Sequence, residues 1–387
     1  MTSWKTYKLG DVVNILDNRR IPLSAREREQ RHGEYPYYGA QGIIDYVDDY
    51  LFDGTYLLIA EDGENLRSKK QNIAQLVSGK YWVNNHAHIL ESNGLCDIRY
   101  ICYLLNIIDI SGYITGSAQP KLNQANLLAI SISLPPLEEQ RRIAGILSAI
   151  DDKIENNRRI NTTLELQAQA LYKQWFVDNR SDDWEEKPLA EIAEFIGGYS
   201  YKGNELVDTS TMAMATIKNF ERKGGFKVEG FKDIVASSKL KVEQHAKIFD
   251  ILVAHTDLTQ NADVIGNAEI LLTCGGYTDI IFSMDLVKVL PKENFPYKFL
   301  LAAMLKNPYF KAHCLGYVNG TTVLHMSKKA LPEYVFACPS NEEAEKMDNA
   351  FKAYYQKMAK ILQENETLAT LRDTLLPKLM NGEIITK

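Results

Sequence analysis

Apolar residues recur at alternating steps of three and four along the middle of the chain. The series starts at Leu147 and runs to Trp175. A mean spacing of 3.5 residues is typical of a coiled coil, in which one stripe of a helix faces a partner helix. The pattern predicts a helix of about 40 residues, which is about 60 Å long at 1.5 Å per residue. The residues assigned to this stripe are Leu147, Ile150, Ile154, Asn161, Leu164, Leu171 and Trp175.

The same pattern occurs a second time near the end of the sequence. A shift of 204 residues places Gly116 on Gly320, Pro135 on Pro339 and Glu138 on Glu342 without a gap. The shifted stripe begins at Phe351, and its expected members are Phe351, Tyr354, Met358, Asn365, Leu368, Leu375 and Leu379. We therefore expect two long helices.

Each helix needs another element to cover its apolar stripe, because a single helix cannot bury that stripe alone. A compact return path would pair them as antiparallel partners, although each helix could instead pack on its own globular domain. Asn161 and Asn365 occupy the same position in the two stripes. An Asn within such a seam can fix the register of pairing. The alternative is that both amides face solvent at the edge of the seam.

The segments that precede the helices also begin alike. A shift of 180 residues places Trp4 on Trp184 and Leu9 on Leu189. Between the matched ends the two segments differ greatly, which suggests two related domains that recognise different things. We expect an α+β fold with a pseudo-twofold internal repeat: two globular domains separated by an antiparallel two-helix coiled coil. The predicted boundaries are 1–134 and 181–339 for the globular domains, and 135–180 and 340–387 for the helices.

Composition narrows the class of protein. The chain has 387 residues, a formal net charge of −6 and five cysteines without a CxxC pair. An odd cysteine count argues against a disulfide framework, so we expect reduced thiols in the cytoplasm. The amino-terminal segment does not resemble a signal peptide, and no apolar stretch is long enough to span a membrane. His86 and His88 are spaced as metal ligands sometimes are, but the sequence has no further Cys or His near them, so we predict no metal.

Catalytic motifs do not stand out. The sequence has no glycine-rich phosphate loop and no N-P-P-Y or D-P-P-Y tetrapeptide of an adenine methyltransferase. Asn307 opens a similar "NPYF" stretch that lacks the second proline. We predict that the chain is not an enzyme and binds no cofactor of its own.

Local basic segments indicate nucleic-acid binding, although the chain is acidic overall. Residues 218–247 hold eight Lys or Arg against four Asp or Glu. Lys and Arg neutralise phosphates, and Asn and Gln can pair with adenine edges. Solvated surface charge and, for the tyrosines, core packing remain alternatives. The candidate DNA contacts are Arg19, Arg20, Arg26, Arg28, Tyr37, Tyr38, Lys69, Lys70, Gln71, Asn84, Asn85, Lys121, Lys202, Lys218, Asn219, Arg222, Lys223 and Lys227.

The repeated architecture resembles a known family over nearly the whole chain. The motifs are the "PPLEEQRRI" opening of the first helix, the tryptophan start of each domain, and a "GSAQ" stretch before the helix. Together they resemble the specificity subunits of type I restriction-modification systems. By this resemblance, Gly116, Ser117 and Gln119 lie on the DNA-facing side. The corresponding stretch after Gly320 supplies Thr321 and Thr322, but Val323 replaces the Gln.

The resemblance implies a function without chemistry. Two target-recognition domains each read one half of a bipartite asymmetric DNA site, and the helices set the spacer between the halves. Partners are double-stranded DNA, two methyltransferase subunits that carry S-adenosylmethionine, and translocating restriction subunits in the full complex; no membrane is involved. A stand-alone DNA-binding or antirestriction-type protein, or a coiled-coil adaptor without a DNA role, remains an alternative.

Overall fold

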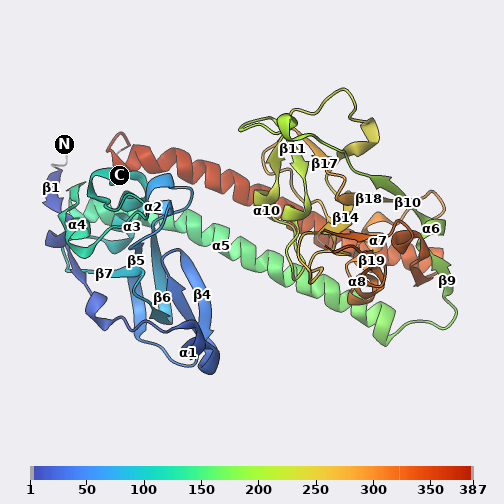
Figure 1. The fold of residues 1–387 in the computed structure, drawn as a ribbon, viewed down its shortest axis with the longest axis horizontal. Coiled ribbons are helices and arrows are strands. Elements are labelled where there is room, and N and C mark those ends of the chain that lie inside the picture. Colours follow the sequence, from blue (N-terminus) through green and yellow to red (C-terminus); the bar gives the residue numbers. More distant parts are fainter. Residues whose placement is uncertain (1–3, 322, 385–387) are drawn as a thin grey trace. The chain divides into compact units, whose positions relative to one another are not determined.

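Two compact units of mixed helix and strand make up the structure. A computed structural model describes residues 4–321 and 323–384. Unit 1 is formed by residues 1–153 and 369–387, as far as they are described, and unit 2 by residues 154–368. Both units follow an α+β plan (Figure 1). Within the described ranges, no helix is long and apolar enough to cross a membrane.

Unit 1 is built around one six-stranded sheet with the order β2-β7-β5-β6-β3-β4. Helix α3 packs against β5 and β6, where its apolar face is buried. The strands are β1 Lys5–Lys8, β2 Val13–Ile15, β3 His32–Gly39, β4 Gly42–Val47, β5 Phe52–Ala60, β6 Ala74–Val83, β7 Ala87–Ser92 and β8 Ser131–Leu134. The helices are α1 Ala25–Gln30, α2 Asn65–Ser68, α3 Ile98–Ile107, α4 Gln124–Ala129 and the first part of α5 Leu137–Lys173.

Unit 2 contains two four-stranded sheets, with the orders β10-β18-β14-β16 and β12-β11-β17-β13. Its first strands are β9 Glu185–Pro188, β10 Ala193–Gly197, β11 Met212–Ala215, β12 Lys232–Asp233, β13 His245–Ala246, β14 Ile251–Ala254 and β15 Thr256–Asp257. They are followed by β16 Ala268–Ile270, β17 Asp279–Phe282, β18 Leu286–Pro291, β19 Val318–Asn319, β20 Leu324–Met326 and β21 Val335–Cys338. The helices are α6 Leu189–Ile192, α7 Lys298–Leu305, α8 Pro308–Leu315, α9 Ala330–Glu333 and most of α10 Asn341–Met380.

The two units share a frame that matches the sequence repeat. The antiparallel pair β1 and β8 in unit 1 corresponds to β9 and β21 in unit 2. The order β2-β7-β5-β6 corresponds to β10-β18-β14-β16. Beyond this frame the units differ: unit 1 extends its sheet with β3 and β4, whereas unit 2 adds a separate sheet around β11 and β17. The expectation of a common frame with different interiors is confirmed.

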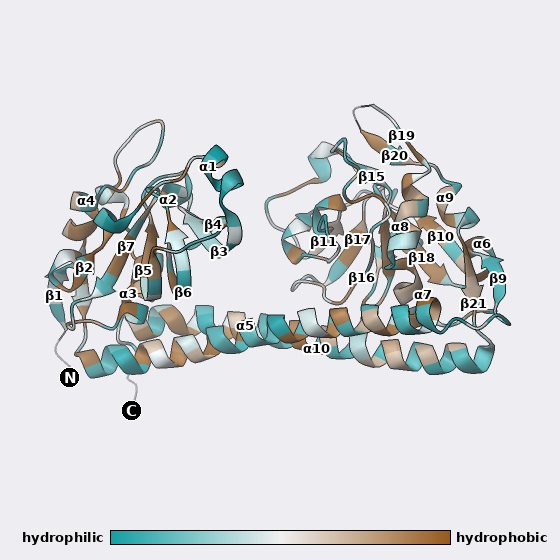
Figure 2. Cartoon of the chain, turned by 90° about the horizontal axis from the view of Figure 1, so that it is seen from below, coloured by the Kyte–Doolittle hydropathy of each residue, from teal (hydrophilic) through white to brown (hydrophobic). Residues whose placement is uncertain are grey.

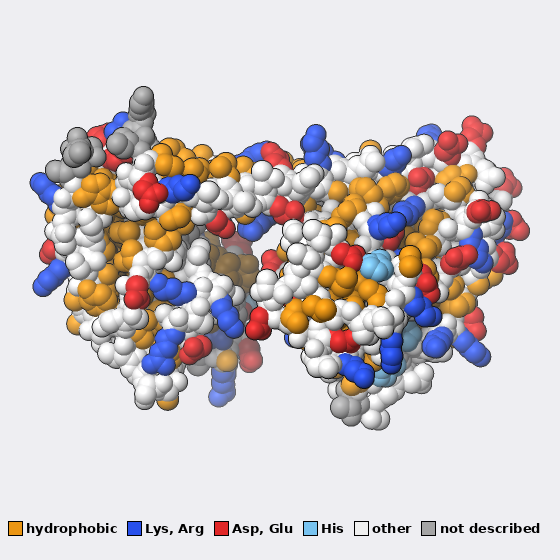
Figure 3. All heavy atoms as spheres, turned by 90° about the horizontal axis from the view of Figure 1, so that it is seen from above, with side chains coloured by type: hydrophobic (Ala, Val, Ile, Leu, Met, Phe, Trp, Pro, Cys, Tyr) orange, Lys and Arg blue, Asp and Glu red, His pale blue; other side chains and the backbone are white. Residues whose placement is uncertain are grey.

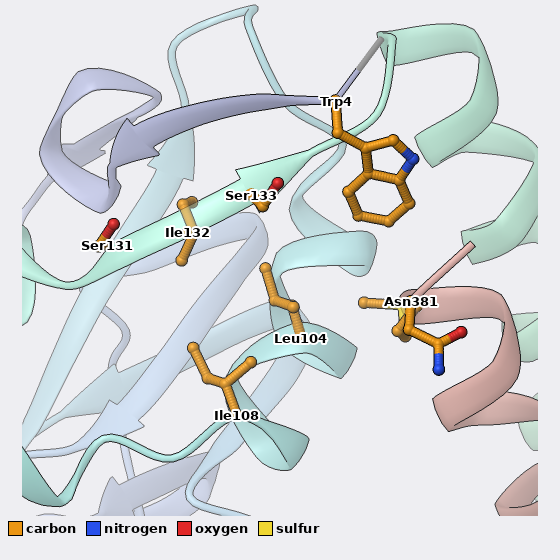
Figure 4. A pocket seen from close by; sticks show the side chains of 8 residues that line it. Trp4, Leu104, Ile108, Ser131, Ile132, Ser133 and Asn381 are labelled. Carbon is orange, nitrogen blue, oxygen red and sulfur yellow. The ribbon is translucent and has the colours of Figure 1, made fainter. Parts of the chain in front are cut away.

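Both long helices are continuous through the point at which the units divide. In unit 1, Arg372 of α10 forms an ion pair of 2.8 Å with Asp151 of α5, which also accepts a hydrogen bond from Tyr103. Leu147 and Leu379 are buried in the same apolar cluster. The end of α10 also lies beside β8 and α3, where Trp4, Leu104, Ile132 and Met380 help to line an open depression of about 420 Å³ (Figure 4).

In unit 2, the two helices make a pair of reciprocal contacts. The amide of Asn161 donates to the carbonyl of Met358 at 3.4 Å, and the amide of Asn365 donates to the carbonyl of Ile154 at 3.4 Å. The internal shift of 204 residues converts one contact into the other. Asn157, which is buried, donates to Asn365 and to Glu364. These contacts run in opposite directions along the two helices, so the helices are antiparallel here, and the amides bridge them instead of facing solvent.

The remaining members of the predicted stripes are also placed on this seam. Phe351 and Met358 are fully or nearly fully buried, and Ile154 is 7% exposed. Partial burial against the core of unit 2 describes Leu164, Leu171, Trp175 and Tyr354, and partial burial against that of unit 1 describes Leu375. Ile150 and Leu368 are half-buried.

Candidate nucleic-acid interface

A tight hairpin turn in unit 1 carries the residues that the sequence comparison between the two halves singled out. Thr115 and Lys121 exchange two backbone hydrogen bonds of 2.8 Å, which close the turn. Gly116 has a φ of +83°, and a Cβ there would lie 2.2 Å from the carbonyl oxygen of Gln119. Only glycine fits such a position. Ser117 and Gln119 are exposed at the tip.

The same turn recurs in unit 2. Asn319 pairs with His325, as Thr115 pairs with Lys121. Gly320 has a φ of +120°, and a Cβ there would lie 2.3 Å from the carbonyl oxygen of Val323. Thr321 is exposed beside it. Thr322, also predicted to contact DNA, lies outside the described residues. In Figure 2, β19 and β20 lie at the end of unit 2 that is far from α10.

Each turn is anchored on the equivalent central strand of its sheet. In unit 1, the backbone N–H of Leu122 donates to the carbonyl of Glu61, which follows β5. In unit 2, the N–H of Met326 donates to the carbonyl of His255, which follows β14. The bridge between Asp62 and Lys121 likewise corresponds to the pairing of Thr256 with His325. The repeat thus preserves a whole supersecondary unit, which we call the recognition hairpin: residues 115–122 in unit 1 and 319–326 in unit 2.

Side chains brace the tip of each recognition hairpin. The guanidinium of Arg67 donates to the carbonyls of Gly116 and Ser117. The amide of Gln260 donates to the carbonyl of Thr321 at 2.6 Å. These contacts hold the peptide groups of the turn before any ligand binds. Neither Arg67 nor Gln260 was predicted, because neither belongs to a motif in the sequence.

An ion network lies beneath the first recognition hairpin. Glu61 accepts from Arg20 at 2.9 Å and pairs with Lys121 at 3.3 Å. Burial opposes ionisation of Glu61, but the hydrogen bond from Arg20 and the surrounding positive charge lower the pKa of this carboxyl overall. Arg20 also pairs with Asp17, which contacts one ring nitrogen of His88 at 2.5 Å. The other ring nitrogen of His88 contacts the carbonyl of Leu122 at 2.7 Å, so the base of the hairpin is fixed to the sheet.

Asp17, Glu61 and His88 are close enough to hold a metal ion, with ligand atoms within 4.8 Å of one another. The contacts just described occupy these atoms. Arg20 and Lys121 bring positive charge to the same carboxylates that a metal would require. The group is therefore better explained as a support for the hairpin than as a metal site.

Other turns converge on the same edge of unit 1. The N–H of Asn84 donates to the carbonyl of Tyr38 at 3.0 Å, and the N–H of Glu61 donates to the carbonyl of His86 at 2.9 Å. His86 also contacts Asp62 at 2.6 Å. Asn85 and His86 are exposed at this edge. The turns after β3, β5 and β6 thus form a polar rim beside the recognition hairpin.

The remaining basic candidates of unit 1 are mostly on the surface. Exposed positions are held by Arg19, Arg26, Lys69, Lys70 and Gln71. Arg19 lies over the ring of Phe52 at 4.6 Å. Arg28 is engaged with Asp45 at 2.8 Å and has less freedom to move. Figure 3 shows Lys and Arg side chains at the end of unit 1 that is far from the helices.

Four predicted contacts are corrected by the structure. Tyr37 is 1% exposed, and its hydroxyl accepts from the N–H of Leu23. Asn219 is fully buried, where its amide donates to the carbonyl of Lys227 and its oxygen accepts from Thr216. Asn84 is 6% exposed and accepts from the N–H of His86. The guanidinium of Arg20 forms ion pairs with Asp17 and Glu61. Buried polar groups need such internal partners, so these side chains are not free to contact bases.

In unit 2, the basic segment contacts residues 263–267. Exposed side chains are Lys202, Lys218, Arg222, Lys223 and Lys227. Arg222 approaches Asp263 at 3.6 Å, and the amide of Asn267 donates to the carbonyl of Glu221. Residues 221–222 thus contact the segment that also holds Gln260, which braces the second hairpin.

Known sequences that this chain resembles are described as specificity proteins of type I restriction systems. Residues 1–166 match the family described as type I restriction modification DNA specificity domain. The chain is 24% identical over 417 residues to the MjaIX specificity subunit of Methanocaldococcus jannaschii, covering 98% of this chain and 93% of that protein. It is 23% identical to the HindI specificity subunit of Haemophilus influenzae, covering 99% and 100%. A further Haemophilus influenzae protein, named provisionally as a specificity subunit, is 37% identical over 147 residues, which span only 37% of its length.

Comparison with solved structures gives the same fold. The crystal structure of the type I restriction-modification S subunit from M. genitalium aligns over 98% of this chain and 96% of that chain. The TM-score is 0.60 at 16% sequence identity. At this identity the likeness concerns the fold.

Proposed function

We propose that this chain is a specificity subunit of a type I restriction-modification system, like the proteins it resembles, and that it recognises a bipartite asymmetric DNA site, with each unit reading one half. The observation that carries the proposal is the recognition hairpin. It occurs once in each unit, at the same place on a shared frame, with a glycine turn and exposed polar side chains at the tip. A shared frame supports a common way of meeting DNA, and different surroundings support different sequences.

In this proposal, affinity and sequence selectivity come from different residues. The exposed basic side chains, among them Arg26, Lys69 and Lys223, contact phosphates and fix the register on the duplex. Ser117, Gln119 and Thr321 at the hairpin tips, with Gln71 and Asn85 nearby in unit 1, contact base edges. The net charge of −6 is compatible with this division, because partner subunits can supply further positive charge to the DNA.

We propose that α5 and α10 act as a spacer. Each helix contributes residues to both units. The reciprocal Asn161 and Asn365 contacts support a defined register, because a shift of one residue would leave these amides facing apolar side chains. The proposed boundaries follow: 1–134 and 181–339 recognise DNA, whereas 135–180 and 340–387 set the distance and offer exposed faces for docking.

We assign the catalytic steps to partner subunits and not to this chain. Two methyltransferase subunits would dock on the helices and carry S-adenosylmethionine, and translocating restriction subunits would join in the full complex. The chain itself is proposed to be non-catalytic. Its role would be to place the partners' active sites beside the adenines of each half-site.

Domain exchange tests the proposal. Residues 1–134 are replaced by the first domain of another specificity subunit, and the methylated adenines in cells are sequenced. We expect one half of the methylated motif to change while the other half and the spacer persist. Independent readers cannot change both halves at once, so that outcome would reject the assignment. The pure chain, freed of partners, should transfer no methyl groups.

A further inference from the structure

The basic residue at the base of the recognition hairpin differs between the units. Lys121 in unit 1 and His325 in unit 2 occupy the same place, because each pairs with the strand across the hairpin and with the strand that anchors it. The anchor residues differ as well. Glu61 in unit 1 corresponds to His255 in unit 2, since each accepts the equivalent backbone hydrogen bond. A Glu and Lys pair is thus replaced by two histidines.

In unit 1, the charge at this place is permanent. The ammonium of Lys121 lies 3.3 Å from Glu61, and its side chain is 52% exposed. A lysine keeps its charge across the physiological pH range. The exposed ammonium of Lys121 can meet a phosphate, although Glu61 competes for it.

In unit 2, the charge depends on protons. His325 is exposed on β20 and pairs with Thr256 of β15, and His255, the residue before Thr256, is half-buried. Burial first, and then the charges of His325 and Lys328, lower the pKa of His255, while Asp285 opposes this effect. Asp285 is itself held by Thr256 at 3.0 Å and Ser283 at 3.2 Å. Among the described residues, no carboxylate forms an ion pair with His325 equivalent to that of Glu61 with Lys121.

An exposed histidine at the base of a hairpin that is proposed to meet DNA is suited to bind an anion when it is protonated. We propose that His325 is a proton-dependent phosphate ligand of the second recognition hairpin, so that the second half-site is held more tightly as pH falls from 8 to 6. The inference rests on the proposed DNA-binding function and adds a difference between the two halves of the site.

The opposite polarity is a distinct alternative. A neutral His325 could accept a hydrogen bond from a base edge, and protonation would then abolish the contact. Binding would weaken as pH falls. The sign of the pH dependence therefore separates a phosphate ligand from a base acceptor.

Reciprocal substitutions give the test. The full chain is purified with its methyltransferase partner, and affinity is measured at constant salt between pH 6 and pH 8. The probe is a duplex carrying the site found by methylation sequencing, beside duplexes with one half-site scrambled. One proton taken up changes affinity by at most about tenfold per pH unit. We expect the parent to bind about five- to tenfold more tightly at pH 6 than at pH 8, relative to H325K, which should be nearly independent of pH.

The matched variant, K121H, is designed to give the first hairpin the pH-dependent binding that we propose for the second. K121H should introduce a pH dependence that persists when the second half-site is scrambled. Folding of each variant is checked by its thermal unfolding midpoint at both pH values, and a variant that loses cooperative unfolding is replaced by H325Q. Equal pH slopes for parent, H325K and H325Q would overturn the proposal, as would weaker binding of the parent at pH 6. Failure to distinguish the site from scrambled duplex at every pH would instead reject the DNA-reading function itself.

Discussion

Replacing Gly116 by alanine should disable the first recognition hairpin. Two effects act together. An alanine at φ +83° costs about 1 kcal/mol or more because its Cβ crowds its own backbone. The Cβ would also lie 2.2 Å from the carbonyl oxygen of Gln119, and this is backbone that cannot rotate away. The turn must open, which breaks the bracing contacts from Arg67.

The expected loss falls on one half-site. If Ser117 and Gln119 each lose a base contact worth about 1–3 kcal/mol, affinity for the complete site falls about 30-fold to about 20,000-fold. Affinity for a duplex whose first half is already scrambled should change little. The assay is equilibrium binding of the purified complex to both duplexes at one salt concentration.

Gly94 provides the matched control for this substitution. It has a φ of +97° and is exposed, but a Cβ there would meet nothing within 4 Å. Gly94→Ala therefore carries the backbone strain without the clash, and should leave both duplexes bound as by the parent. Equal affinities of Gly116→Ala and the parent for the complete site would refute the reasoning, provided that both proteins unfold at similar temperatures.

Three further predictions concern the helices and their supports. Lys306 is nearly buried between Glu269 at 2.6 Å and Glu165 at 3.0 Å, so Lys306→Met should cost about 3–5 kcal/mol in denaturant unfolding, and adding Glu269→Gln with Glu165→Gln should recover much of it. Arg141→Met, which breaks an exposed pair with Glu138, should cost under about 1 kcal/mol and serves as its control. A double-mutant cycle on Asp151 and Arg372 should give a coupling energy of about 0.5–1.5 kcal/mol, and additive effects would mean that this ion pair does not join α5 to α10. Insertion of four residues after both Asn157 and Ile361 lengthens each helix by about 6 Å, so methylome sequencing should show a spacer longer by one or two base pairs, whereas a parental spacer in an active variant would contradict the spacer role.

The long helices and the shared frame could be predicted because their signals are periodic. The stripe from Leu147 and the stripe from Phe351 need only the spacing of apolar residues, and both helices are present as 37 and 40 residues. The strands β5, around Leu57, and β14, around Val253, also lie in apolar runs of the sequence. Such features depend on local sequence and on burial of one face.

The recognition surface could be predicted only in part, because contacts between distant residues leave no local signal. Asn219 and Asn84 have the side-chain chemistry that reads adenine, but tertiary packing buries both. Arg67 contributes through carbonyl groups 49 and 50 residues away, which no spacing rule reveals. His325 could have been found, since the shift of 204 residues places it on Lys121. A comparison of charged residues at equivalent positions of the repeat would have shown the difference.

The central claim is that each unit reads one half of a single site, and one measurement addresses it directly. The methylated motif is determined by sequencing the modified adenines of cells that carry the parent chain, the exchange of residues 1–134, or the exchange of residues 181–339. We predict that each exchange replaces a different half of the motif and keeps the spacer. A motif that survives either exchange intact, or that changes in both halves after one exchange, would contradict the account.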